Sequence, residues 1–282
     1  MKTVKDQIHY WCNDTINRVV LGQNITVAVL DTGISRHPDF GKRIIAFKDI
    51  IKDRKIPYDD SGHGTHVCGI LAGNGSLSGG TFGGMAPRSK LVIVKVLDEN
   101  GDGSIDEVVK GIQWVLDNQK KYQIRIVNIS VGTKPDVPKK NSEKLIEMTQ
   151  RLWDAGMVVV ASAGNYGPKE NSISIPGTCK KIITVGALGK EEELVSSSRG
   201  PTQECVIKPD ILAPGEKIMS CQGKWYAQKS GTSMSTPIVS GGIALLLSKY
   251  PEMTNVEVKL LLRHTMDSNR RIHIERLLNT SL

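Results

Sequence analysis

Ser230-Gly231-Thr232-Ser233-Met234-Ser235-Thr236-Pro237, followed by the run Ile238–Tyr250, is the stretch around which this chain of 282 residues is organised. A turn of small residues leads directly into a long apolar segment, which predicts a buried helix with the Ser233 hydroxyl at its start. The first backbone N–H groups of a helix have no partner within the helix and carry the positive end of its dipole. The serine therefore lies beside a site suited to negative charge, such as the oxygen that forms when a hydroxyl attacks a carbonyl.

A serine nucleophile requires a base and a group that orients the base. The apolar stretch Val27–Gly33 predicts a strand that ends in Asp31. The glycine-rich turn Ser61–Val67 presents His63 at the start of another small-residue segment. The candidates therefore occur along the chain in the order Asp31, His63, Ser233.

Four short motifs carry a resemblance to a known family. Asp31-Thr32-Gly33, His63-Gly64-Thr65-His66 and Gly231–Pro237 resemble the three signature motifs of the subtilisin-like serine proteases, and Ala163-Gly164-Asn165 resembles the oxyanion-hole motif of that family. The resemblance extends from about Gly22 to His264. Within the family, the chain resembles the intracellular bacterial members.

The resemblance implies a serine endopeptidase that works through an acyl-enzyme. Ser233 would be the nucleophile, His63 would take its proton and return it to the leaving amine, and Asp31 would orient the imidazole and stabilise its cation. The side-chain amide of Asn165 and the backbone N–H of Ser233 would bind the oxyanion.

Substrate binding in this family occurs by strand addition, in which an extended peptide pairs with an exposed sheet edge. The resemblance implies two walls and a floor for the side chain that precedes the scissile bond. Small residues at these positions, none of them acidic, predict broad specificity that favours apolar side chains. The walls are Ser130, Val131 and Gly132 on one side and Ala163 and Gly164 on the other; the floor is Ser174, just before Ile175-Pro176, where the family has a cis-proline.

Each of these residues has a simpler interpretation. Ser233 could be a helix N-cap, Asp31 a ribose-binding carboxylate at a strand end, and Asn165 a left-handed turn residue. No Gly-x-Gly-x-x-Gly precedes Asp31. The spacing of the family assigns catalysis to His63 and a structural hydrogen bond to His66, and no glutamate lies between them to suggest a zinc motif.

Two other classes of function compete with a protease. A pseudoprotease acting as a binding scaffold would be expected to lack a member of the triad, but Asp31, His63, Ser233 and Asn165 are all present. A Rossmann-type nucleotide enzyme is suggested only by the alternation of strands and helices, and the glycine fingerprint is missing.

The alternating pattern predicts an α/β fold: a mostly parallel central sheet with helices on both faces, in a single domain. Residues 1–21 are expected to be a lead-in segment that packs through Ile8, Trp11, Ile16 and Val19, and residues 22–282 the peptidase domain. Strands are predicted at Asn24–Leu30, Leu91–Leu97, Arg125–Ser130, Met157–Ala161 and Lys181–Ala187. Helices are predicted at His63–Ala72, from Ser104 to about Lys120, at Asn141–Ala155, and from Thr254 to about His264.

Composition restricts the partners. The formal net charge is +8 and the pI about 9.2, but the basic residues are scattered, which argues against nucleic-acid binding. The sequence shows neither an apolar run that would span a membrane nor a signal peptide, and its five cysteines are an odd number. A cytoplasmic protein is therefore expected, or a secreted one if the chain is a processed mature fragment.

No required cofactor is predicted and no residue is assigned as a metal ligand, with calcium kept open as an alternative. Asp39 resembles a position that helps to bind calcium in some relatives, but the loop Gly73–Gly84 contains no acidic residue, so the usual calcium loop is not matched. Cys68 lies near a position where some relatives have a cysteine beneath the catalytic histidine. It is either a reactive thiol or a small core residue. Protein or peptide substrates are expected, with activity restrained by the N-terminal extension or by an inhibitor protein.

Overall fold

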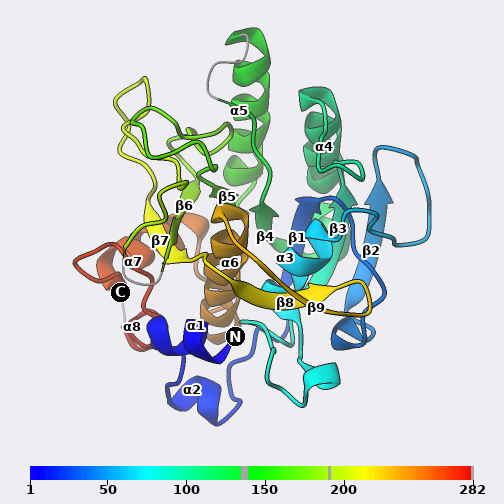
Figure 1. Cartoon of the computed structure of the whole chain (residues 1–282), viewed down its shortest axis with the longest axis vertical. Helices are drawn as coiled ribbons and strands as arrows, with labels where there is room; N and C mark the ends of the chain where they lie inside the picture. The colour runs from blue at the N-terminus through cyan, green and yellow to red at the C-terminus, as the bar shows by residue number, and fades with distance from the viewer. Residues whose placement is uncertain (135–138, 190–191, 281–282) are drawn as a thin grey trace.

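The computed structural model describes residues 1–134, 139–189 and 192–280 (Figure 1). The strands are β1 (Thr26–Asp31), β2 (Ile44–Asp49), β3 (Lys90–Lys95), β4 (Ile124–Ile129), β5 (Val158–Ser162), β6 (Ile183–Leu188), β7 (Ile211–Pro214), β8 (Ile218–Gln222) and β9 (Trp225–Lys229). The helices are α1 (Lys2–Gln7), α2 (Asn13–Ile16), α3 (His63–Ala72), α4 (Ile105–Tyr122), α5 (Lys139–Asp154), α6 (Thr232–Lys249), α7 (Asn255–Thr265) and α8 (Ile274–Asn279), with short 3-10 turns at Pro38–Phe40 and Ser76–Ser78.

Seven strands form one sheet in the order β2-β3-β1-β4-β5-β6-β7, and every neighbouring pair is parallel. Because the strands are parallel, their carboxyl ends lie at the same edge, where open α/β sheets bind ligands. Asp31 ends β1, Ser130 follows β4, and Ser162 ends β5. The sheet order therefore brings three of the predicted motifs to one edge.

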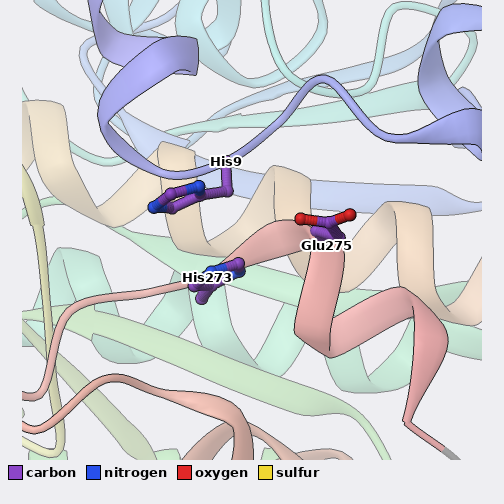
Figure 2. Close-up of side chains that lie close together, drawn as sticks. All are labelled: His9, His273 and Glu275. Atoms are coloured by element: carbon purple, nitrogen blue, oxygen red, sulfur yellow. The ribbon is translucent and has the colours of Figure 1, made fainter.

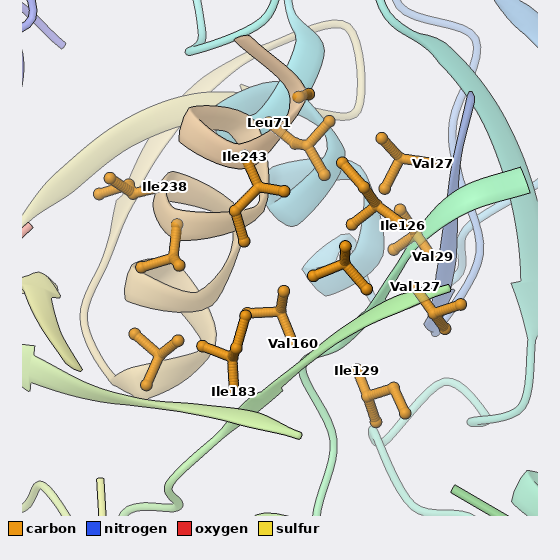
Figure 3. Close-up of a cluster of buried hydrophobic side chains, with 14 of the residues drawn as sticks. Val27, Val29, Leu71, Ile126, Val127, Ile129, Val160, Ile183, Ile238 and Ile243 are labelled. Carbon is orange, nitrogen blue, oxygen red and sulfur yellow. The ribbon is translucent and has the colours of Figure 1, made fainter. Parts of the chain in front are cut away.

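Helices cover both faces of the sheet, as predicted. α3 contacts β1 and β3, and α6 contacts β4 to β7; α4 and α5 contact each other and pack on the strands from the opposite face. A cluster of buried apolar side chains lies between α6 and the sheet (Figure 3), and a buried polar pair joins them, Ser240 of α6 donating to Asn128 of β4 at 2.9 Å. α6 is itself buried along most of its length, which explains why its sequence lacks a polar stripe.

The helix starts follow from local sequence. Ser104 and Glu107 form the capping box predicted for α4, and Thr254 and Glu257 form the same motif at α7. α3 occupies His63–Ala72, the predicted range. Side-chain caps thus fix the beginning of α4 and α7.

The lead-in segment differs from the prediction. Ile8 is buried, but Trp11, Ile16 and Val19 are 48%, 59% and 60% exposed. The segment forms two short helices, α1 and α2, separated by a turn, and its apolar residues do not share one buried face.

Several elements were not predicted. They are the edge strands β2 and β7, the antiparallel hairpin β8–β9 and the final helix α8. The hairpin packs on α3, beside His63, and therefore bears directly on the site.

Candidate active site

Asp31 and His63 are in direct contact. Asp31 is fully buried at the end of β1, and its Oδ1 lies 2.7 Å from Nδ1 of His63, the first residue of α3. The same oxygen accepts a hydrogen bond from the Thr32 backbone N–H at 2.7 Å. The carboxylate thus favours the imidazole tautomer protonated at Nδ1 and leaves Nε2 as the free base.

The protonation of His63 depends on opposing effects. Burial lowers the pKa of His63, but the charge of Asp31 and its hydrogen bond outweigh burial, so the pKa of His63 is raised above 6.5. A buried carboxylate beside the ring therefore favours the imidazolium that a general base becomes when it accepts a proton.

Asp59 connects the strand that carries Asp31 to the helix that carries His63. Its Oδ1 accepts hydrogen bonds from Thr32 Oγ1 and the Gly62 N–H, both at 2.8 Å. Its Oδ2 accepts from the N–H of Thr65 at 2.8 Å and from the hydroxyl of Thr65 at 2.5 Å. The sequence analysis missed this residue because an aspartate in a charged loop gives no signal of such a role.

Lys95 is a second positioning residue that was missed. Its side chain is fully buried, and Nζ donates to the carbonyls of Thr32 at 2.6 Å and Leu97 at 2.7 Å and to Asp60 Oδ1 at 2.7 Å. The bond to Thr32 fixes the backbone directly after Asp31. A lysine inside an otherwise apolar strand was the available signal, since a lysine is almost never fully buried unless it is paired.

Ser233 is the second residue of α6, where a backbone N–H has no partner within the helix. Its hydroxyl donates to the backbone carbonyl of Ser130 at 3.0 Å. Ser233 and His63 line the same cavity of about 890 Å³. The serine–histidine hydrogen bond of a triad is often loose in a free enzyme and tightens when substrate binds.

Asn165 lines this cavity beside Ser233. Its Oδ1 accepts hydrogen bonds from the backbone N–H of Thr232 at 3.1 Å and from the Thr232 hydroxyl at 3.2 Å. Because the amide oxygen is held in this way, the NH₂ group is the part of the side chain left to donate to a ligand.

The predicted pocket residues lie together. A Cβ on Gly132 would lie 2.6 Å from Ser174 Oγ, and a Cβ on Gly164, which has φ +99°, would lie 2.8 Å from Ser174 Cβ. Ser174 is fully buried and donates to the carbonyl of Ala163 at 3.1 Å. Both walls therefore approach the floor so closely that a side chain on either glycine would fill the space.

Two further predictions concern which residues line the cavity and the peptide bond before Pro176. The cavity that holds Ser233 and His63 is also lined by Ser130, Val131, Gly132, Gly164 and Ser174, whereas Asp31 and Ala163 are fully buried and are not among its lining residues. The peptide bond between Ile175 and Pro176 is cis, as the family resemblance implied.

His66 makes the structural hydrogen bond predicted for it. Its Nε2 lies 3.0 Å from the carbonyls of both Ile218 and Ala227, so it joins α3 to the two strands of the hairpin. Burial lowers the pKa of His66 to about 4, which leaves the ring neutral and donating from Nε2 at neutral pH.

The surroundings of Asp39 do not suit calcium. Oδ1 accepts hydrogen bonds from the Leu77 N–H at 3.1 Å and from Ser76 Oγ at 3.3 Å. Oδ2 accepts from Tyr226 Oη at 2.9 Å and from Cys221 Sγ at 3.5 Å. Calcium needs free carboxylate and carbonyl oxygens, and the donors already present occupy this carboxylate.

A second group of metal-type ligands, His9, His273 and Glu275, joins the N-terminal segment to α8 (Figure 2). The two imidazoles are stacked, with ring centroids 4.0 Å apart and an angle of 3° between the ring planes. Imidazole lone pairs lie in the ring plane, and parallel planes do not meet, so one ion cannot lie in line with both. The geometry favours a docking contact between the two ends of the chain.

Comparisons with known proteins agree with the fold and with the family that the motifs resemble. Residues 22–278 match the model of the subtilase family of peptidases. The chain is 39% identical over 279 residues to serine protease AprX of Bacillus subtilis, an alignment covering 89% of this chain and 63% of that protein. It is 35% identical to subtilisin Savinase of Lederbergia lenta, with 89% and 87% covered. The solved structure of S41 psychrophilic protease superposes with a TM-score of 0.77 at 31% identity, covering 86% of this chain and 83% of that one.

The extent of the match differs between relatives. The chain spans 63% of the length of AprX and 64% of that of a thermostable alkaline protease from Halalkalibacterium halodurans. Within the described residues, none of the helices is long and apolar enough to cross a membrane.

Proposed function

The chain belongs to the subtilase family, and on that premise we propose that it is a serine endopeptidase that hydrolyses proteins through an acyl-enzyme on Ser233. Asp31, His63 and Ser233 act as the triad, and Asn165 donates to the oxyanion. The observation that carries the proposal is that one cavity is lined by Ser233, Asn165 and a histidine whose Nδ1 is held 2.7 Å from a buried carboxylate.

The chemistry follows from these positions. Ser233 Oγ attacks the substrate carbonyl while Nε2 of His63 takes its proton, and the Asn165 amide and the Ser233 N–H donate to the oxyanion. His63 then protonates the leaving amine, which breaks the peptide bond. Water, deprotonated by His63, then attacks the ester carbonyl; the bond to Ser233 Oγ breaks, His63 returns the proton to that oxygen, and the carboxylic acid product leaves.

The test is hydrolysis of casein and of a peptide substrate by the purified chain and by Ser233→Ala. Loss of the nucleophile should lower kcat by roughly six orders of magnitude, the effect it has in subtilisin itself. Asn165→Ala should lower kcat by about a hundredfold to a thousandfold, again the range known for that donor in subtilisin.

A serine-directed phosphonate separates this proposal from a pseudoprotease scaffold. The protein should be labelled at Ser233, and the label should be absent from Ser233→Ala. A folded protein that neither takes the label nor cleaves any substrate would refute the proposal.

We also propose that the pocket accepts a broad range of side chains and favours apolar ones. Its support is the small-residue walls formed by Gly132 and Gly164 over Ser174. Gly132→Ala should shift the preference at the residue before the scissile bond from large to small side chains, because its methyl group fills the space beside Ser174. Ser174→Ala enlarges the same space and serves as the opposite control. A peptide-library profile dominated by lysine or arginine would contradict the apolar preference.

No cofactor is needed for these steps, because side chains supply the base, the acid and the oxyanion donors. A chelator is therefore expected to leave peptide hydrolysis unchanged. All five cysteines are free, which supports a reducing, cytoplasmic location; cell fractionation would test it. Restraint by an inhibitor protein remains a prediction, to be checked by recovery of inhibited complexes.

A further inference from the structure

A buried group of metal-type ligands lies between the hairpin β8–β9 and the 3-10 turn Pro38–Phe40. His37 directly precedes this turn, Asp39 is part of it, and Cys221 belongs to β8. One ligand atom from each of these side chains lies within 4.8 Å of the other two. The three residues are 4%, 0% and 1% exposed, and none of them lines the cavity that holds Ser233. The group is therefore separate from the candidate active site.

The carboxylate of Asp39 is buried without a lysine or arginine beside it. Within residues 1–134, 139–189 and 192–280, neither type of residue forms an ion pair with it. Arg43 donates to the backbone carbonyl of Asp39 instead. The groups that donate to the carboxylate are neutral hydroxyl, amide and thiol groups. A buried charge is normally paired or bound to a metal ion, so a cation is the expected partner.

His37 is oriented as a ligand and not as that cation. Its Nε2 lies 3.1 Å from the Trp225 carbonyl, so Nε2 carries the ring proton. Its Nδ1 accepts a hydrogen bond from the Asp39 N–H at 3.2 Å and therefore keeps its lone pair. This bond is longer than the usual value of about 2.9–3.0 Å, and a metal ion would compete with it. Metal-bound histidines are held in the same way, with the other ring nitrogen donating to a carbonyl.

The distances between the ligand atoms suit a small tetrahedral ion. Nδ1 of His37 lies 3.7 Å from Oδ1 of Asp39, and Sγ of Cys221 lies 3.5 Å from Oδ2. Zinc bonds of about 2.0–2.3 Å in tetrahedral geometry place neighbouring ligand atoms roughly 3.3–3.6 Å apart. A thiol and an imidazole also favour zinc over calcium and magnesium, which take oxygen ligands.

We propose that His37, Asp39 and Cys221 form a zinc site that joins the hairpin β8–β9 to the turn before β2. When Zn²⁺ binds, the S–H bond of Cys221 breaks, its proton passes to solvent, and the sulfur electron pair forms the bond to zinc. Thiolate and carboxylate together balance the two positive charges of the ion, and water takes the fourth position. The inference is independent of the proposed endopeptidase function.

The test uses Ser233→Ala, so that self-cleavage and activity play no part. The chain is produced in medium supplemented with Zn²⁺ or Co²⁺, which lets the ion enter while the buried site forms. The zinc protein should contain one zinc per chain and have a Tm several degrees above that of chelator-treated protein, because the ion binds the folded state. The cobalt protein should show a sulfur-to-cobalt charge-transfer band in the near ultraviolet, since a thiolate is a ligand.

Two ligand variants and one control are made in the same background. Cys221→Ser should lose the band and weaken zinc binding by at least about a hundredfold, since even changes outside the ligand shell cost about 10–100-fold. His37→Gln should weaken zinc binding by a similar factor while keeping every cysteine. Cys205→Ser removes the exposed thiol, where adventitious metal would bind, and should keep both the band and the affinity. Circular dichroism of chelator-treated protein shows that each variant is folded.

The outcomes decide for or against this site alone. A band that depends on Cys221 and not on Cys205, with one metal ion per chain, supports it. The proposal is overturned if the chain takes up no metal during production, if metal binds without the sulfur band, or if the band persists in Cys221→Ser.

Discussion

The pKa of His63 results from burial, which lowers it, and from the contact with Asp31, which raises it more. At the scale of single residues, this balance decides the pH range in which the site can act. A general base must be neutral, so activity is lost as the pH falls through the pKa of the base.

We therefore expect the acid limb of kcat/KM against pH to have its midpoint above pH 6.5. Asp31→Asn removes the charge that raises the pKa, so the limb should move to lower pH, and kcat should fall by about 10⁴ because the tautomer is no longer fixed. Asp102→Asn, a carboxylate of the cavity lining that is not paired with His63, is the control and should keep the midpoint. A wild-type midpoint at or below pH 6.5 would contradict the prediction.

The cysteines give a second test at this scale. Cys205 is exposed, whereas Cys12, Cys68, Cys179 and Cys221 are buried, and burial raises the pKa of the Cys68 thiol. One thiol per chain should react with a disulfide reagent in the native protein, and five after unfolding. Cys205→Ser should lose the fast reaction and keep its activity in the presence of a mercurial. Rapid inactivation of that variant would show that Cys68 is reachable.

At the scale of elements, the hairpin β8–β9 is attached to α3 through His66, which must remain neutral to be accommodated there. The pKa of His66 is about 4 in the folded protein and about 6.5 when unfolded. Between these values the unfolded chain binds more protons, so stability rises with pH over this window and is lost as the pH falls from 6.5 toward 4.

The free energy of unfolding should fall by roughly 3 kcal/mol across that window, since each pKa unit corresponds to about 1.4 kcal/mol. Urea unfolding at pH 7 and at pH 4.5 measures it. In His66→Gln, which can still donate a hydrogen bond but does not titrate there, the dependence should be much weaker. His63, whose pKa is raised, acts with the opposite sign and above pH 6.5 only. An equal pH dependence in both proteins would contradict the prediction.

Strong local patterns made some elements predictable. β1 and β3 to β6 are apolar runs between turns, and capping boxes marked α4 and α7. β2 lies at an edge of the sheet, most of its side chains are partly exposed, and it ends in two charged residues. β7 has four residues and ends in proline. Neither strand therefore shows the pattern of a buried strand. The hairpin and α8 depend on packing against α3 and α6, which local sequence does not reveal.

The same distinction holds for the site. The motif residues lie together at one cavity because each follows a recognisable strand or opens a helix. Asp59 and Lys95 act through residues distant in sequence, and only folding shows their partners. The directions of the Ser233 hydroxyl and the Asn165 amide likewise depend on Ser130 and Thr232, which no spacing rule supplies.

At the scale of the whole molecule, α6 connects the candidate site to the two chain ends. Ser233 opens the helix, and Lys249, its last residue, pairs with Asp14 at 2.8 Å. At about 1.5 Å per residue the two ends of this helix are roughly 25 Å apart. Residues 1–21 therefore pack far from the cavity, and none of them lines it.

Loosening this segment should lower stability without raising activity. Ile8→Asp places a charge at a site that is 1% exposed, so Tm should fall by about 5–10 °C. Ile16→Asp, in the same segment but 59% exposed, should change Tm little. Below Tm, kcat/KM should match the wild type for both. An increase in kcat/KM in Ile8→Asp would instead support the expected inhibitory extension.

The parallel order of the sheet has a consequence for how the protein is lost by cleavage of its own unfolded copies. Neighbours such as β1 and β4 are separated by about ninety residues along the chain, and pairings between such distant segments form slowly. A molecule that unfolds is therefore expected to refold slowly. While it is unfolded, its chain is an extended peptide of the kind that the cleft of a folded molecule binds. Loss of the enzyme through autolysis is then bimolecular, because a folded copy cleaves an unfolded one, and the rate of loss per molecule should fall on dilution.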